Sequence, residues 1–222
     1  MNEQPKFGIG RAEVQPHWPS VAAALAIGVI YIAMPDALIV GPRWLLLAVT
    51  TLLLIPALIS LHAGKLRLNE ILAYAGLSVI TLALISSLTL LVIRLPEHKD
   101  APVELLRAAG ALWVSNILVF ASWYWRLDGG GPNERDKQGV HTDGAFLFPQ
   151  MAMDQSLRKQ TGEECWSPGF IDYLFLAFNT STAFSPTDVP VLSQWAKVLM
   201  MVQSMISLMT VALLAARAVN IL

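Results

Sequence analysis

The sequence predicts an all-α fold, a polytopic transmembrane helical bundle of six hydrophobic segments. Three observations predict it. Of 222 residues, 55% are hydrophobic and only 14% are charged, whereas a soluble domain carries about 25% charged residues. The charges cluster between long apolar runs, and four runs have no charge at all. These runs approach the roughly 20 residues that a helix needs to cross about 30 Å of hydrocarbon. Because lipid offers no partners to backbone amides, such runs must be helices.

The six segments are separated by short polar connections and, once, by a long one. The first contains Asp36, the fifth contains Asp172, and the others carry no charge. Tryptophans lie near the ends of the runs, as expected at membrane–water interfaces. The segments run from Trp18 to Val40, Trp44 to Leu61, Ile71 to Ile93, Ala108 to Trp125, Phe170 to Phe184 and Val198 to Ala216.

These boundaries predict four regions. Residues 1–17 form a polar N-terminal segment and residues 18–126 a four-helix transmembrane region. Residues 127–169 form a polar or interfacial loop, which opens with Asp128-Gly-Gly-Gly-Pro132, a strong helix stop. Residues 170–222 form a C-terminal helix pair.

Orientation depends on the long loop. The positive-inside rule favours a cytoplasmic N-terminus, given six full spans. The preference comes from Arg126, Arg135, Lys137, Arg158 and Lys159, since without them both sides carry equal numbers of Lys and Arg.

Composition and motifs exclude several classes of function. A net charge of −1 and the lack of a basic tract argue against nucleic-acid binding. The chain has no nucleophile elbow, His-Glu-x-x-His motif or phosphate loop, so we expect no enzyme. His141 and Asp143 are two ligand types without a third, so we expect no metal, and no cofactor is indicated.

The fifth segment is the most informative part of the chain. It begins apolar around Asp172 and becomes polar towards its end, and a Ser-Pro-Thr-Asp turn follows. The arrangement resembles the pore hairpin of the potassium-channel superfamily over roughly residues 105–220. There, an aromatic, threonine-rich pore helix precedes a filter that ends in aspartate. The resemblance implies a pore-like set of Asp172, Asn179, Thr180, Ser181, Thr182, Ser185, Thr187 and Asp188.

The filter itself departs from that family. The family pattern has glycines before the aspartate, where this chain has Ser185-Pro186-Thr187. Glycine tolerates the backbone conformations that aim carbonyls at an ion, and proline does not. We therefore expect no potassium-selective filter. Two readings stay open: a re-entrant pore loop, or a short full span followed by a helix start with Ser185 as N-cap and Asp188 at its third residue.

Polar residues also follow one face of the sixth segment. Gln203, Ser207 and Thr210 have the i, i+4, i+7 spacing of a helical stripe. They pack against neighbouring helices or line a wet path. The expected partners are Asn179 to Thr182 and, on the fourth segment, Ser115 and Asn116.

Motifs of the C-terminal half also resemble a bacterial family of uncharacterised multi-pass membrane proteins. They are Trp123-Tyr-Trp-Arg-Leu-Asp-Gly-Gly-Gly131, Phe148-Pro-Gln150 and Ala183-Phe-Ser-Pro-Thr-Asp188. The resemblance implies a plasma (inner) membrane location. The leading functional hypothesis is an ion-channel-like pore module, formed by a homo-oligomer in the lipid bilayer. The alternative is a non-conducting scaffold or accessory subunit that binds a membrane or cytoplasmic protein through the 127–169 loop.

Overall fold

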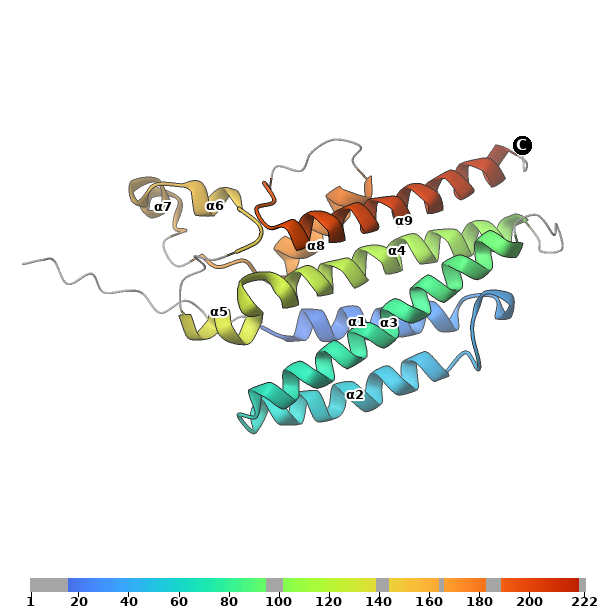
Figure 1. Ribbon diagram of the computed structural model, residues 1–222, viewed down its shortest axis with the longest axis horizontal. Coiled ribbons are helices and arrows are strands. Elements are labelled where there is room, and N and C mark those ends of the chain that lie inside the picture. Colours follow the sequence, from blue (N-terminus) through green and yellow to red (C-terminus); the bar gives the residue numbers. More distant parts are fainter. Residues whose placement is uncertain (1–15, 95–101, 139–143, 164–165, 183–188, 220–222) are drawn as a thin grey trace, which may run out of the picture.

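The computed structural model describes residues 16–94, 102–138, 144–163, 166–182 and 189–219. Within these ranges the elements are helical, apart from an isolated antiparallel bridge between Phe146 and Val191. Long helices lie side by side along the longest axis of the molecule (Figure 1). Short helices of the 127–169 region gather at one end, which we call the loop end. The opposite end is the far end.

The first four long helices form an antiparallel bundle. Helix α1 (Trp18–Ile32) runs from the loop end to the far end, and α2 (Leu45–His62) returns. Helix α3 (Leu66–Arg94) runs out again, and α4 (Pro102–Leu127) comes back. Contacts between the helices establish these directions. The His17 ring centroid lies 5.5 Å from that of Trp125, and the Tyr74 hydroxyl donates a hydrogen bond to the Arg126 carbonyl at 3.1 Å.

The first predicted segment is helical over less of its length than expected. Helix α1 stops at Ile32, and a short 3-10 helix, η1 (Asp36–Leu38), follows Pro35. Proline disfavours the helical conformation of the residue before it, which explains the early stop. Asp36 therefore lies just beyond the end of α1, and its carboxylate accepts a hydrogen bond from the Arg43 guanidinium at 2.7 Å.

The predicted helix stop after α4 is confirmed. Helix α4 ends at Leu127 and gives way to η3 (Asp128–Gly130). Gly129, Gly130 and Gly131 have φ values of 57°, 76° and 91°. Residues other than glycine rarely adopt positive φ values, so the run of glycines allows the sharp reversal of the chain. A Cβ on Gly131 would lie 2.8 Å from the Arg126 carbonyl oxygen.

The 127–169 region packs on the loop end. It contains α5 (Pro132–Gln138), α6 (Pro149–Ala152) and α7 (Gln155–Thr161). Phe146 and Phe148 are buried against Tyr124 and Tyr173, with ring centroids 5.2 and 5.3 Å apart. Much of this region is therefore fixed to the bundle by aromatic packing.

The C-terminal pair comprises α8 (Phe170–Thr182) and α9 (Gln194–Val219). Both start at the loop end and run parallel. Phe170 lies 5.8 Å from Trp125, and Trp195 lies 6.1 Å from Phe146. Between them, Leu192 donates its backbone N–H to the Ala145 carbonyl at 2.8 Å. Two consecutive full spans would run antiparallel, and these two helices do not.

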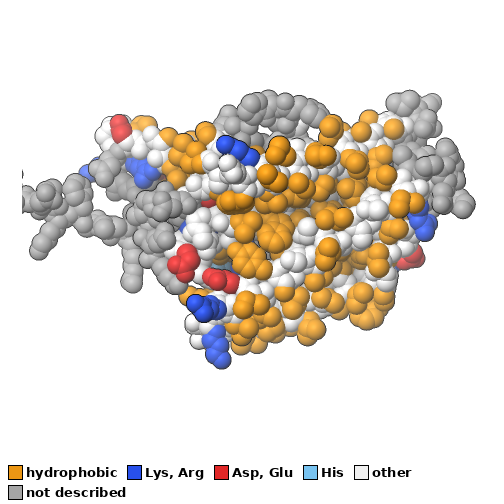
Figure 2. Space-filling view, in the orientation of Figure 1, with side chains coloured by type: hydrophobic (Ala, Val, Ile, Leu, Met, Phe, Trp, Pro, Cys, Tyr) orange, Lys and Arg blue, Asp and Glu red, His pale blue; other side chains and the backbone are white. Residues whose placement is uncertain are grey.

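The chain is a multi-pass membrane protein by the length and apolarity of its helices. Among the described residues, four helices could cross a membrane: Leu45–His62, Leu66–Arg94, Val103–Gly130 and Gln194–Ala216, with Trp18–Ile32 shorter. Figure 2 shows hydrophobic side chains covering the middle of one face, with charged residues mostly towards the two ends.

One of the two readings left open for the fifth segment placed the start of the last helix at Ser185, and α9 does not start there. Helix α9 begins at Gln194, because residues 189–193 are extended or bent, and the Ser193 hydroxyl accepts from the Ala196 N–H at 3.3 Å. A continuous last helix capped at Ser185 is therefore excluded. Ser185 itself lies outside the described residues.

Candidate functional site: the inner end of helix α8

Helix α8 is too short to cross a membrane alone. Its 13 residues span about 20 Å at 1.5 Å per residue, against about 30 Å of hydrocarbon. It starts beside Trp125 near the end of α4, and its last turns lie beside the middle of α4, where Phe178 is 6.1 Å from Trp113. The C-terminal end of α8 therefore lies inside the bundle, and we call it the inner end.

Gln203 of α9 is the hub of the inner end. Its side chain is fully buried. Its amide nitrogen donates to the Ala177 carbonyl at 2.7 Å and to the Ser181 hydroxyl at 2.8 Å. Its amide oxygen accepts from the Tyr124 hydroxyl of α4. One side chain thus joins three helices, α4, α8 and α9.

The serines of α9 serve the last carbonyls of α8. Ser207 donates to the Ser181 carbonyl at 2.6 Å, and Ser204 lies 3.4 Å from the Thr180 carbonyl. Trp113 of α4 in turn donates its indole N–H to the Ser207 hydroxyl at 3.0 Å. The final carbonyls of any helix lack partners within the helix. Here Ser204 and Ser207 of α9 supply partners for the Thr180 and Ser181 carbonyls, which accounts for the positions of these two serines along α9.

Asn116 adds a further polar group from α4. It is fully buried, and its amide nitrogen donates to the Gln203 backbone carbonyl at 3.3 Å. Its Oδ1 has no hydrogen-bond partner among the described residues. Ser115 beside it is also buried. Of the partners that the sequence predicts for the α9 stripe on the fourth segment, Asn116 therefore contacts the backbone carbonyl of Gln203.

The remaining predicted polar residues divide into two groups. Thr180 and Thr210 are buried and bond to carbonyls of their own helices, at 2.8 and 2.7 Å. Thr182 is exposed and Asn179 is half-buried, so both side chains remain accessible at the C-terminal end of α8. Ser185, Thr187 and Asp188 lie outside the described residues.

Asp172 is separate from the inner end. It lies in the first turn of α8, at the loop end, and its carboxylate accepts from the Gly169 N–H at 2.7 Å. This contact is the half of a capping box in which the third-residue carboxylate accepts from the backbone N–H before the helix. The negative charge of Asp172 also lies near the positive end of the helix dipole, which is favourable. The structure therefore gives Asp172 a capping contact at helix α8's start.

A second buried polar cluster was missed by the sequence reasoning. Asp128 is fully buried, and its carboxylate accepts from the Ala145 N–H and, at 2.6 Å, from the Tyr173 hydroxyl. Arg135 of α5 is also buried and donates to the Trp125 and Asp128 carbonyls at 2.9 and 2.6 Å. Its guanidinium lies 5.3 Å from the Tyr173 ring. These contacts join the end of α4, the loop and the start of α8.

No sequence signal separates these residues from ordinary loop charges. Asp128 stands in a glycine run and Arg135 in a charged stretch, and both patterns usually mean solvent exposure. They are buried because the chain reverses at Gly129–Gly131, which brings both side chains into the interior of the protein.

No group of three or more His, Cys, Asp or Glu side chains that could hold a metal occurs among the described residues. No family model, curated protein or solved structure matches the chain.

Proposed function

We propose that this membrane protein carries an ion-conducting pore module formed by a homo-oligomer in the plasma membrane, with α8 as a re-entrant half-helix that enters from the loop end. One observation carries the proposal. A helix of about two thirds of the required length ends inside the bundle, and the carbonyls of its last two turns accept hydrogen bonds from Gln203, Ser204 and Ser207 of the next helix. Water would serve those carbonyls if the helix ended outside the membrane.

The direction of α8 favours cations. The C-terminal end of a helix carries about half a negative charge, and half-helices that end within a membrane use this end to coordinate cations. Asn179 and Thr182 lie at this end and remain accessible. The segment Ser185–Asp188 begins three residues after Thr182 in the sequence. A pore at this position would be cation-selective without the glycine filter of potassium channels.

The pore requires more than one subunit. Gln203, Ser207 and Thr210 are buried within a single chain, so the polar stripe of α9 cannot line a path there. The outward faces of α8 and α9 are apolar and exposed, as Phe175, Met201 and Met205 illustrate. Subunits that pack through such faces around an axis would bring several inner ends together in a closed ring.

Ion flux in liposomes tests the proposal. Purified protein should dissipate a Na⁺ or K⁺ gradient, and Thr182→Val and Asp188→Asn should each lower the rate at least severalfold. Thr161→Val is a matched control, since Thr161 is also exposed and bonds to carbonyls of its own helix, α7. The pore would be refuted if no cation gradient gave a flux, or if all three variants gave equal flux.

A non-conducting scaffold is the second candidate, and one observation favours it. The polar groups of Gln203 and Ser207 are used within the chain, as expected when polar residues only hold helices together. Binding would then fall on the loop, where α7 presents exposed Leu157, Lys159 and Gln160.

Surface substitutions on α7 test the scaffold. Leu157→Ser with Lys159→Glu should abolish capture of a stable partner while leaving the fold intact. Deleting residues 133–160 would be a poor test, because that range contains the buried Arg135, Phe146 and Phe148. Flux without any partner would favour the pore, and a partner lost with the α7 variant would favour the scaffold.

A further inference from the structure

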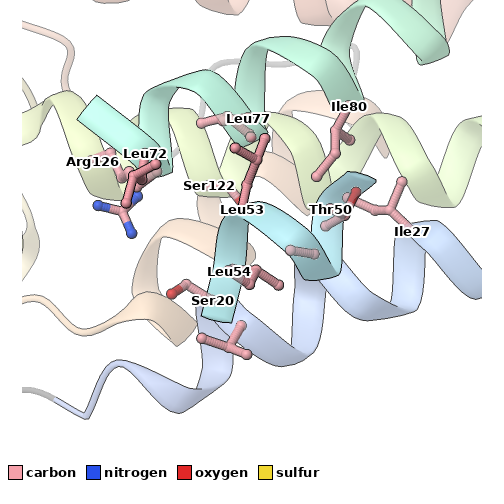
Figure 3. A pocket seen from close by; sticks show the side chains of 14 residues that line it. Ser20, Ile27, Thr50, Leu53, Leu54, Leu72, Leu77, Ile80, Ser122 and Arg126 are labelled. Carbon is pink, nitrogen blue, oxygen red and sulfur yellow. The ribbon is translucent and has the colours of Figure 1, made fainter. Parts of the chain in front are cut away.

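A narrow cavity lies between α1, α2, α3 and α4, away from the inner end of α8. Its enclosed volume is about 50 Å³, and the space between the walls rises to about 520 Å³ when the open mouth is included. Figure 3 shows Arg126 and Leu72 towards one side of the cavity and Ile27, Thr50 and Ile80 towards the other. From Leu72 to Ile80 the α3 wall rises about 12 Å.

The two ends of the cavity differ in exposure. Ile27, Thr50, Leu77 and Ile80 are buried, so this end is closed. Ser20, Leu72, Ala73 and Arg126 are half-buried, so the end beside Arg126 is the mouth. A ligand would enter from the loop end and insert its apolar part first.

Arg126 puts a cation at the mouth. Among the described residues no hydrogen bond or ion pair is formed by its guanidinium, which lies 5.3 Å from the Trp125 ring. Glu70 and Arg135 are the charged groups near it. Arg126 lies one residue before the end of α4, and the end of a membrane helix is the depth at which a long cationic side chain reaches the lipid headgroups.

We propose that this cavity binds one anionic lipid of the loop-end leaflet, with the end of an acyl chain in the enclosed part of the cavity and the acidic headgroup on Arg126. A largely apolar cavity with one charged group at its mouth suits an amphiphile. Guanidinium binds phosphate through paired hydrogen bonds, and basic pockets between membrane helices are known to favour anionic headgroups. The charge at the mouth favours phosphatidylglycerol, which carries a net negative charge, over phosphatidylcholine, whose choline cancels the charge of its phosphate.

Native mass spectrometry of the purified protein with added lipid tests the site. We expect one molecule of phosphatidylglycerol to be retained, with about tenfold preference over phosphatidylcholine because of its net negative charge, a difference of about 1.4 kcal/mol. Arg126→Gln should remove the preference. Arg107→Gln is the matched control, an exposed arginine at the far end of the same helix. Equal binding of both lipids, or a preference that survives Arg126→Gln, overturns the proposal.

Variants of the cavity wall test where the acyl chain lies. Ala73→Leu should fill the cavity and abolish retention. If that variant does not fold, Gly76→Ala decides, because its Cβ would sit 3.9 Å from Leu53, an ordinary contact, and should weaken retention severalfold. Thr50→Val should keep or improve retention, since an acyl end prefers a methyl to a hydroxyl. Unchanged retention in Gly76→Ala, or weaker retention in Thr50→Val, counts against an acyl chain in this cavity.

Discussion

At the scale of single residues, Gln203 holds the C-terminal half together. Replacing it with leucine removes hydrogen bonds to Tyr124, Ser181 and the Ala177 carbonyl. Since hydrogen bonds between membrane helices average roughly 0.6 kcal/mol each, we expect Gln203→Leu to destabilise the fold by about 2 kcal/mol. Unfolding in mixed micelles measures this. Thr210→Val is the control, because Thr210 bonds only to its own helix, and equal stability of the two variants would show that Gln203 is no hub.

His17 predicts a dependence of stability on pH. It precedes α1, lies 3.9 Å from Asp136, and its pKa is lowered from 6.5, first by burial, with Asp136 opposing and Arg126 and Arg135 adding to the effect. A folded-state pKa below the unfolded one means that the unfolded chain binds the proton better. Stability is therefore retained above pH 6.5 and lost as pH falls through that value.

Melting temperatures between about pH 8 and about pH 5.5 check this window. His17→Gln should lose less stability on acidification than the parent protein. His62→Gln should behave like the parent, since His62 is exposed at the α2–α3 turn. An identical acid response in His17→Gln would contradict the assignment to His17.

At the scale of elements, the parallel course of α8 and α9 predicts which residues share a side of the membrane. A re-entrant α8 puts Lys159 in α7 and Gln194 at the start of α9 on the same side, together with Lys65 in the α2–α3 turn. Trp44 at the α1–α2 turn lies on the other side. A spanning α8 would move Gln194 across.

Single cysteines at these four positions, in a Cys165→Ser background, check this with a membrane-impermeant maleimide. All four positions are exposed, so access to the thiol depends on sidedness alone. We expect the Lys159, Gln194 and Lys65 positions to label together and the Trp44 position to label only from the opposite side. If the cysteine at position 194 labels from the same side as the cysteine at position 44, α8 spans the membrane and the re-entrant course is excluded.

Small residues decide how closely two helices approach. A Cβ on Gly28 of α1 would lie 2.7 Å from the Leu47 side chain and 3.3 Å from its Cα, so α1 and α2 meet at a glycine. This contact is typical of membrane helix pairs, in which close backbone approach replaces hydrophobic burial as the cause of association. The close approach at Gly28 also sets the distance between α1 and α2, the two helices that form one wall of the proposed lipid cavity.

At the scale of the whole molecule, the pore proposal predicts a homo-oligomer. Mass measurement of the protein in lipid nanodiscs should give a closed ring of subunits. Polar substitutions of the exposed α9 residues Met201 and Met205 should shift it towards monomer and reduce ion flux together. Leu52→Ser on the exposed face of α2 is the control and should change neither. A monomer that still conducts ions would separate flux from assembly and contradict a pore between subunits.

Orientation is also set at this scale. If α9 starts at the loop end, Lys197 joins that end and Arg217 moves to the far end, opposite to the sequence expectation for six full spans. The exchange leaves the loop end richer in Lys and Arg positions, with Lys65, Arg67, Arg135, Arg158 and Lys159 there and Arg43, Arg94 and Arg107 at the far end. The positive-inside rule still favours a cytoplasmic loop end.

The sequence alone determined that the chain is a membrane-embedded helical bundle and where most helices lie, because a charge-free run of membrane length has one structural solution in lipid. It also indicated the polar stripe of α9, since helical periodicity is local. Only the tertiary structure decided that α8 and α9 run parallel, that Gln203 and Ser207 serve the carbonyls of α8, and that Asp128 and Arg135 are buried. Those features depend on contacts between residues tens of positions apart, which no local pattern of hydrophobicity encodes.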